Sequence, residues 1–247
     1  LLIRTSHSVQ LTEAGEELLP YARRTLQDAT LCATRLNDLK SCLAGTHNIG
    51  VTYSFNPMLT ETLVEFMKLY PKVKLNIFYR PMDELMEMLR TREVDFALAF
   101  KPSLPIPDVA SHILFQNHLA VIVGEGHSLA SLEKVTLQEL SRYDLALPVK
   151  GLQARNALDQ LLLKYPCELK IRIELNEVNI LLKLIRHGKL ATILAEASIH
   201  NETGVKAIPI DIPDNEMAGC VHTLKDSYHK RSMQEFIRLL GESAAIR

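Results

Sequence analysis

One pattern of predicted secondary structure occurs twice in this chain and restricts the folds open to it. Each copy begins with a strand of alternating apolar and polar residues, followed by an amphipathic helix, a polar link and an apolar strand. The copies cover residues 74–100 and residues 170–195. Strands that alternate with helices are typical of crossover units around a parallel sheet buried on both faces. Two similar α/β units predict two lobes with a cleft between them, an arrangement that suits a hinged receptor for a small molecule.

The two predicted lobes are interleaved along the chain. The first takes residues 46–115 and 216–247, and the second takes residues 116–215. A late strand and a closing helix thus return to the first lobe. The expected strands cover residues 48–53, 73–78, 94–100, 119–123, 145–147, 169–175, 191–194 and 219–223. The expected helices cover residues 58–69, 83–89, 137–140, 152–163, 178–185 and 233–240.

A long helical pattern precedes the first lobe. Thr12 has the character of an N-cap and Gly45 that of a C-terminal stop, so residues 13–45 are expected to form a linker helix. A helix of about 30 residues with one apolar stripe favours pairing with a second copy of itself, and packing on its own domain is the alternative. The stripe consists of Leu18, Leu19, Ala22, Leu26, Ala29, Ala33, Leu36 and Leu43.

Composition excludes several classes of protein. Apolar residues make up 47% of the chain and the net charge is −1, which argues against disorder and against a global positive field for nucleic acid. No apolar run is long enough to span a membrane, and no secretory signal is visible. The chain does not begin with Met, and we expect it to be a piece of a longer protein.

The cysteines point to a reducing compartment. Cys32, Cys42, Cys167 and Cys220 are scattered without a CxxC pair, so we expect reduced thiols in a cytoplasmic protein and neither a zinc site nor a cofactor. A redox-sensing role for one of them is the alternative.

Several short segments carry a family resemblance. An apolar segment with Arg4, followed by VQLTEAG at residues 9–15 and a long helix, resembles the wing and linker start of LysR-type transcriptional regulators. IGV at residues 49–51, YPKV at residues 70–73 and VDFA at residues 94–97 are similar to the effector domain of that family. One departure is Gly188-Lys189-Leu190, where the family usually has Gly-x-Gly.

The resemblance implies a specific domain organisation. Residues 1–12 would be the remnant of a winged helix-turn-helix, in which Arg4, Ser6 and His7 contact DNA phosphates in the parent protein. In this chain alone, a solvated turn is the favoured description of these residues. Residues 46–247 would be an effector-binding domain of the twin-lobed, type 2 periplasmic-binding-protein-like fold. The family forms homodimers or homotetramers. We expect no sequence-specific DNA binding by these 247 residues, since they include no recognition helix.

The resemblance also places the effector between the lobes, beside loops that follow the strands. Lys101 and Lys150 are expected to neutralise an anion across the cleft. Met82 stands where the family often has a small hydroxyl residue, and so predicts a ligand with an apolar portion. The candidate effector-binding residues are Ser54, Phe55, Asn56, Met82, Phe100, Lys101, Pro148, Lys150, Gln153, Asn176, Glu177 and Glu196.

Two other functional classes share the twin-lobed pattern. A solute-binding protein of a transporter would predict a signal sequence and no wing or pairing helix. An enzyme would need a nucleophile or a cofactor lysine in the cleft, and the sequence contains no glycine-rich phosphate loop, GxSxG, HExxH or paired CxxC. We therefore expect no catalytic residues. The prediction is a domain that senses an effector and relays its binding to DNA-binding domains.

Overall fold

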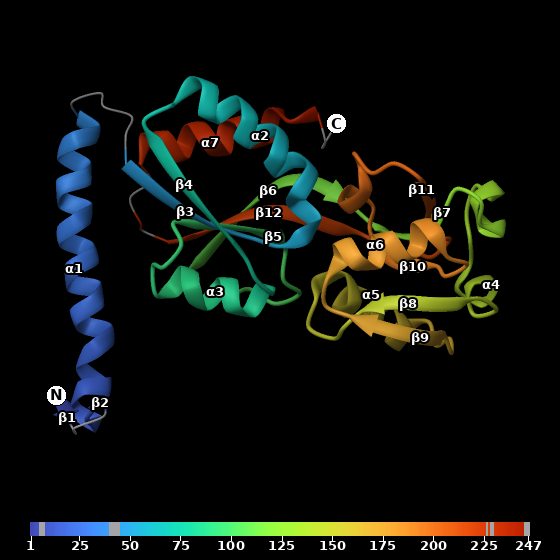
Figure 1. Ribbon diagram of the computed structural model, residues 1–247, viewed down its shortest axis with the longest axis horizontal. Coiled ribbons are helices and arrows are strands. Elements are labelled where there is room, and N and C mark those ends of the chain that lie inside the picture. The colour runs from blue at the N-terminus through green and yellow to red at the C-terminus, as the bar shows by residue number, and fades with distance from the viewer. Residues whose placement is uncertain (5–7, 40–44, 226, 228–229, 245–247) are drawn as a thin grey trace.

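The computed structural model consists of a long helix beside two α/β lobes (Figure 1). It describes residues 1–4, 8–39, 45–225, 227 and 230–244. Among these residues, no helix combines the length and the apolar character needed to cross a bilayer.

The N-terminal strands β1 (Leu2–Arg4) and β2 (Val9–Leu11) pair antiparallel and lead into α1 (Glu13–Leu39). Thr12 is the N-cap that the sequence predicts, since its Oγ1 accepts a hydrogen bond of 3.1 Å from the amide of Gly15. Gly15 itself packs on the hairpin, where an added Cβ would lie 2.1 Å from the Leu1 carbonyl oxygen. Residues 40–44 of the predicted linker lie outside the described residues.

The first lobe is built on a five-stranded sheet with the order β4-β3-β5-β12-β6. β3 runs parallel to β4 and β5, whereas β12 runs antiparallel to β5 and β6. In Figure 1, α2 and α7 cover one face of this sheet and α3 lies on the other. The strands are β3 (Gly45–Val51), β4 (Val73–Tyr79), β5 (Phe96–Phe100), β6 (Val109–Asn117) and β12 (Met217–Leu224). The helices are α2 (Asn56–Leu69), α3 (Met82–Arg90) and α7 (Arg231–Glu242).

The second lobe has two sheets, with the orders β10-β7-β11 and β8-β9. A parallel bridge between Leu145 and Ala191 joins them, which gives the continuous order β9-β8-β10-β7-β11. Its core is a cluster of buried aliphatic side chains. The strands are β7 (Leu119–Gly124), β8 (Asp144–Pro148), β9 (Lys170–Leu175), β10 (Thr192–Ala195) and β11 (Val205–Pro209). The helices are α4 (Leu137–Leu140), α5 (Gln153–Lys164) and α6 (Val178–His187).

The two sheets have the same plan, as the repeated sequence pattern predicts. In each lobe three strands are parallel, and an antiparallel strand then separates them from the last strand: β12 in the first lobe and β7 in the second. The expected parallel pairing is present in three strands of each sheet, but each sheet also contains one antiparallel strand that the pattern did not predict. The sequence interpretation also missed β6 and β11, placed Tyr53 in a strand although it begins the 3-10 helix η1 (Tyr53–Phe55), and treated Gly45 as a helix stop although it begins β3.

The chain passes between the lobes twice, from β6 to β7 and again just before β12. Asn215 ties the two crossings together. Its Oδ1 accepts a hydrogen bond of 2.9 Å from the amide of Leu119, and its Nδ2 donates one of 2.8 Å to the carbonyl of the same residue. These two hydrogen bonds hold together the two chain segments that would act as a hinge between the lobes.

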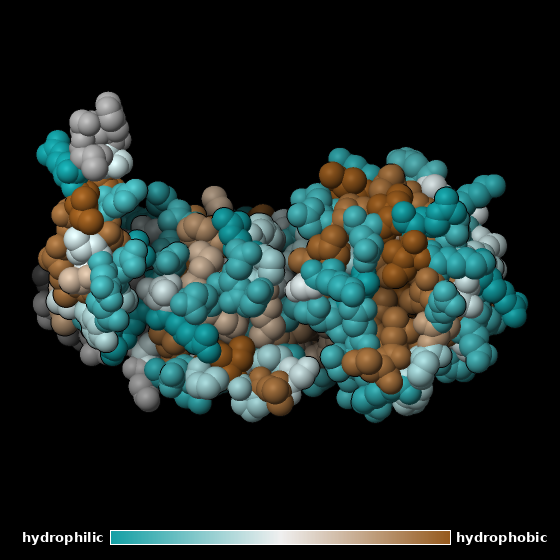
Figure 2. All heavy atoms as spheres, turned by 90° about the horizontal axis from the view of Figure 1, so that it is seen from below, coloured by the Kyte–Doolittle hydropathy of each residue, from teal (hydrophilic) through white to brown (hydrophobic). Residues whose placement is uncertain are grey.

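The face seen in Figure 2 is mostly polar, and apolar side chains gather on it over the second lobe. Exposed apolar residues of that lobe include Leu163 on α5 and Ile171 on β9. On α1, Leu18 and Leu26 are also exposed.

Candidate functional site

A cavity of about 460 Å³ lies between the lobes, where the first residues of four helices meet. α2 contributes Asn56, α3 contributes Met82, α5 contributes Gln153 and α6 contributes Val178. The first N–H groups of a helix lack partners within it, and the helix dipole adds a partial positive charge there. Four such helix ends around one cavity favour an anionic group.

Three of these four helices begin without a side-chain cap. The residues before α2, α3 and α5 are Phe55, Pro81 and Leu152, and none of them accepts a capping hydrogen bond from its helix. Only α6 is capped, because the Glu177 carboxylate accepts a hydrogen bond of 2.9 Å from the Asn179 amide. The starts of α3 and α5 therefore keep their positive character for a ligand, whereas at α2 the Asn56 amide already donates to the Tyr53 carbonyl.

Two buried oxygens in the cavity wall lack a hydrogen-bond partner within the described part of the chain. They are Oγ of Ser198 and Oδ1 of Asn56. Ser198 is 2% exposed and lies in the 3-10 helix η3 (Glu196–Ile199). An unpaired buried polar group costs about 1–3 kcal/mol, so a ligand that pairs with these atoms would recover that energy.

Two tyrosines complete the polar wall. Burial raises the pKa of Tyr53 to about 12, with smaller contributions from the charges of Glu202 and Glu177. Burial also raises the pKa of Tyr79. Both phenols stay protonated at neutral pH and can donate hydrogen bonds.

The cavity also has one cationic side chain and an apolar side. The guanidinium of Arg80 donates a hydrogen bond of 2.7 Å to the Tyr79 carbonyl, and its Nε lies 3.5 Å from Glu84. The Arg80 side chain is about half exposed, so solvent screening weakens its attraction for an anion. The apolar side includes Met82, Pro148 and Leu152.

Seven of the twelve predicted effector residues line this cavity. They are Ser54, Asn56, Met82, Pro148, Gln153, Asn176 and Glu177. The sequence interpretation missed Tyr53, Tyr79, Arg80, Asn179 and Ser198. Arg80 and Ser198 each lie within two residues of a predicted position, so wider windows after each strand would have included them.

The other five predicted residues lie elsewhere. The Phe55 ring is buried in the core of the first lobe, where it contacts Phe100 and Phe115. Phe100 and Lys101 line a second cavity. Lys150 is exposed on the turn that ends at Gly151, whose φ is +97°.

Glu196 pairs with His118 at 2.6 Å, beside the crossing between the lobes. Lys101 and Lys150 therefore do not face one cavity in this arrangement of the lobes.

The predicted DNA-contact and pairing residues lie far from the cavity along α1 and its hairpin. Arg4 is exposed, whereas Ser6, His7 and Leu43 fall outside the described residues. Leu18, Ala22, Leu26, Ala29 and Ala33 are exposed on α1, and Leu19 is half-buried. The Leu36 side chain also falls outside the description.

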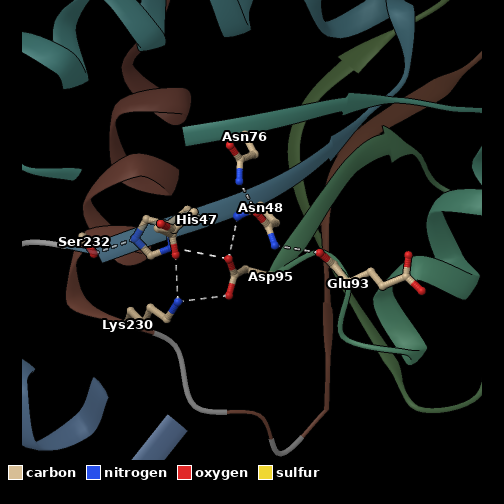
Figure 3. A network of polar contacts seen from close by, with 8 residues as sticks. His47, Asn48, Asn76, Glu93, Asp95, Lys230 and Ser232 are labelled. Atoms are coloured by element: carbon tan, nitrogen blue, oxygen red, sulfur yellow. Dashed lines mark hydrogen bonds and ion pairs between the residues drawn. The ribbon is translucent and has the colours of Figure 1, made fainter. Parts of the chain in front are cut away.

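A separate polar network lies near the start of β3, at the end of the first lobe that is away from the second lobe (Figure 3). His47 is buried and bonds to Ser232 Oγ at 2.7 Å, while its Nδ1 lies 3.6 Å from Asp95. Asp95 also accepts a hydrogen bond of 2.8 Å from the Asn48 amide and pairs with Lys230 at 3.4 Å. Burial acts to raise the pKa of Asp95, but the His47 ring, the Lys230 charge and the Asn48 amide outweigh it, and the pKa is lowered. This network joins β3 and α7 to Asp95, the residue before β5.

The described cysteines are all free: Cys32 is exposed, Cys167 half-buried and Cys220 buried. The described residues contain no group of three or more His, Cys, Asp or Glu side chains placed to hold a metal ion.

Residues 42–245 match the family model described as the LysR substrate binding domain. Among curated proteins, the chain is 24% identical over 206 residues to the probable nitrogen assimilation transcriptional activator of Synechococcus elongatus, covering 80% of this chain and 65% of that protein. It is 32% identical over 142 residues to the HTH-type transcriptional regulator YtlI of Bacillus subtilis, covering 57% of this chain and 46% of the regulator. The chain therefore spans less than two thirds of the length of these relatives.

Solved structures share the fold. The regulatory domain of CcmR from Synechocystis PCC6803, in complex with 2-PG, matches with a TM-score of 0.71 at 19% identity and covers 80% of this chain and 96% of that one. The effector-binding domain of QuiR in complex with shikimate matches with a TM-score of 0.68 at 20% identity, over 81% of this chain and 96% of that one. CbnR, a LysR family transcriptional regulator, matches with a TM-score of 0.64 at 17% identity, over 97% of this chain and 84% of that one.

Proposed function

The chain belongs to the LysR substrate-binding domain family, and we propose that it senses a small anionic effector and relays its binding to the DNA-binding domains of a transcriptional regulator. The observation that carries this proposal is the meeting of four helix starts at one cavity between two lobes. A ligand that touches both lobes favours one arrangement of the lobes over others by its difference in affinity for them.

The cavity defines the chemistry of the effector. A carboxylate would bind at the uncapped helix starts, near the unpaired Ser198 hydroxyl and the Tyr53 phenol. An apolar portion would pack on Met82 and Leu152. The similar domains solved with 2-PG and with shikimate support a small polar ligand, and shikimate carries a carboxylate.

The relay would run through α1. It is followed by β3, the central parallel strand of the first lobe, and Asp28 on α1 forms an ion pair with Arg92 of that lobe. Arg92 has a φ of 59°, in the left-handed region, where a side chain other than glycine's is held at a cost in strain. We propose that the exposed apolar residues of α1 pair with a second copy, so that a movement of the lobes is passed to the DNA-binding domains.

The lining of the cavity supports sensing over catalysis. Its described residues include no His, Cys, Lys or Asp side chain, and its one carboxylate, Glu177, caps α6. A nucleophile needs a base beside it to be activated.

Thermal unfolding in the presence of a panel of carboxylates, each beside its neutral amide, tests the proposal. We expect some carboxylates to raise the melting temperature and their amides to have a smaller effect. Ser198→Ala and Arg80→Ala should reduce that shift, whereas Ser103→Ala, in the second cavity, should not. A panel in which amides and carboxylates act alike, or in which Ser103→Ala is as harmful as Ser198→Ala, would exclude an anion site here.

A further inference from the structure

The cleft between the lobes contains a second cavity, of about 660 Å³. Among the described residues, Met82 and Gln153 are the two that line both cavities. The second cavity also presents Lys101 and, further along α5, Gln160 and Lys164. The two cavities are therefore neighbours, separated at the side chains of Met82 and Gln153.

The Gln153 side chain crosses from the second lobe to the first. Its Oε1 accepts a hydrogen bond of 3.0 Å from the Phe100 amide, and its Nε2 donates one of 3.0 Å to the Phe100 carbonyl. The same Nε2 lies 2.9 Å from Sδ of Met82. Every polar atom of the Gln153 side chain is thus used in contacts with the first lobe.

Strand register explains why Phe100 offers this pair of groups. β3 pairs with β5 only as far as Val51 opposite Leu98, and the Thr52 amide then donates to the Leu98 carbonyl. Backbone groups of residues two apart in a strand point to the same side, so those of Phe100 also face the β3 side, beyond the point where β3 ends. Gln153 supplies the donor and the acceptor that the next residue of a strand would have supplied.

We propose that Gln153 sets the length of ligand that the cavity accepts, by closing the partition between the two cavities. This inference rests on the proposed effector site. With the partition closed, a ligand must fit within about 460 Å³. With the side chain shortened, the two cavities join, and a rod-shaped dianion reaches from the helix starts to the ammonium group of Lys101.

Hydrogen exchange tests the partition without any ligand. Gln153→Ala removes the acceptor for the Phe100 amide, so exchange of the peptide that contains Phe100 should become about tenfold faster, as expected for the loss of about one such bond. Gln160→Ala is the matched control, because Gln160 lies two turns along the same helix and lines only the second cavity. Unchanged exchange in Gln153→Ala, or an equal change in Gln160→Ala, would overturn the partition.

Calorimetry with benzoate and biphenyl-4,4′-dicarboxylate tests selection by length. In Gln153→Ala the ratio of the affinity for the long dianion to that for benzoate should rise at least about tenfold. Lys101→Ala in the Gln153→Ala background should remove most of the gain. Failure of this ratio to rise overturns selection by length. Failure of both probes to bind any variant also overturns the proposed anion site, and the exchange experiment still tests the partition separately.

Discussion

The phenol of Tyr53 donates a hydrogen bond of 3.0 Å to Oδ1 of Asn179, which joins η1 of the first lobe to the first turn of α6 in the second. This bond lies in the wall of the cavity, because both residues line it. A ligand that enters there must fit around the bond or replace it. The protonation state of Tyr53 is therefore part of the chemistry of the site.

Tyr53 should ionise far above the usual range for a phenol. Its pKa is raised to about 12 by burial and by the charges of Glu202 and Glu177. We expect the absorbance difference at 295 nm between the chain and Tyr53→Phe to show no ionisation near pH 10 and a step near pH 12. A step near pH 10 would show that the phenol is solvated, and would contradict its partial burial in the cavity wall.

Removal of the negative charge of Glu177 should strengthen binding of anions. Its carboxylate lines the cavity and repels an anionic ligand, while its neutral amide can still cap α6. In Glu177→Gln the affinity for the most stabilising carboxylate should rise about two- to fivefold, the effect of a partly exposed charge. Calorimetry measures this, with Glu65→Gln on the outer face of α2 as the control. Weaker binding in Glu177→Gln would mean that the carboxylate itself holds the ligand.

Asp95 should stabilise the first lobe in a pH-dependent way. Its pKa is lower in the folded chain than in the unfolded one. Its contribution is therefore complete above the unfolded value of about 4 and is lost as the pH falls through the lowered folded value.

Urea unfolding of Asp95→Asn should show a loss of about 1–3 kcal/mol near pH 7 and a smaller loss near pH 3. Asp144→Asn breaks an exposed pair with Arg172 and should cost less than about 1 kcal/mol. An equal loss for Asp95→Asn at both pH values would show that its charge is irrelevant.

Self-association should depend on the exposed face of α1. Leu18 is 46% exposed to solvent and Leu26 is 71% exposed. Pairing with a second helix would bury this apolar surface. Leu18→Asp and Leu26→Asp together should shift the chain toward monomer in sedimentation equilibrium. Leu104→Asp changes an exposed leucine of a loop in the first lobe and should leave the mass unchanged. A monomeric parent chain would exclude pairing through α1.

The sequence predicted those strands and helices whose buried residues form a regular apolar pattern along the chain. The residues of β5 are all buried, and their unbroken apolar run identified the strand. β6 was missed because its burial is irregular, with Ile113 exposed and Asn117 buried. β11 is short and contains Lys206 and Pro209, which weaken the strand pattern.

The sequence predicted the region of the candidate cavity better than the individual side chains that line it. Loops after the strands do meet at the cavity, since parallel strands end at the same edge of a sheet. The direction of a side chain on a loop has no such rule. Lys150 lies on a turn that contains Gly151, whose φ is positive. Ser198 lines the cavity from the 3-10 helix η3. Neither position has a periodic signal in the sequence.

The position of β12 has a consequence for the order in which the lobes form. β12 lies between β5 and β6, and its Cys220, Val221 and His222 are almost completely buried there. During synthesis the ribosome releases every strand of the second lobe before it releases β12. The second lobe can therefore close while the sheet of the first still has a gap between β5 and β6. We therefore expect the lobe nearer the N-terminus to finish folding last, with β5 and β6 presenting open edges to other chains until then.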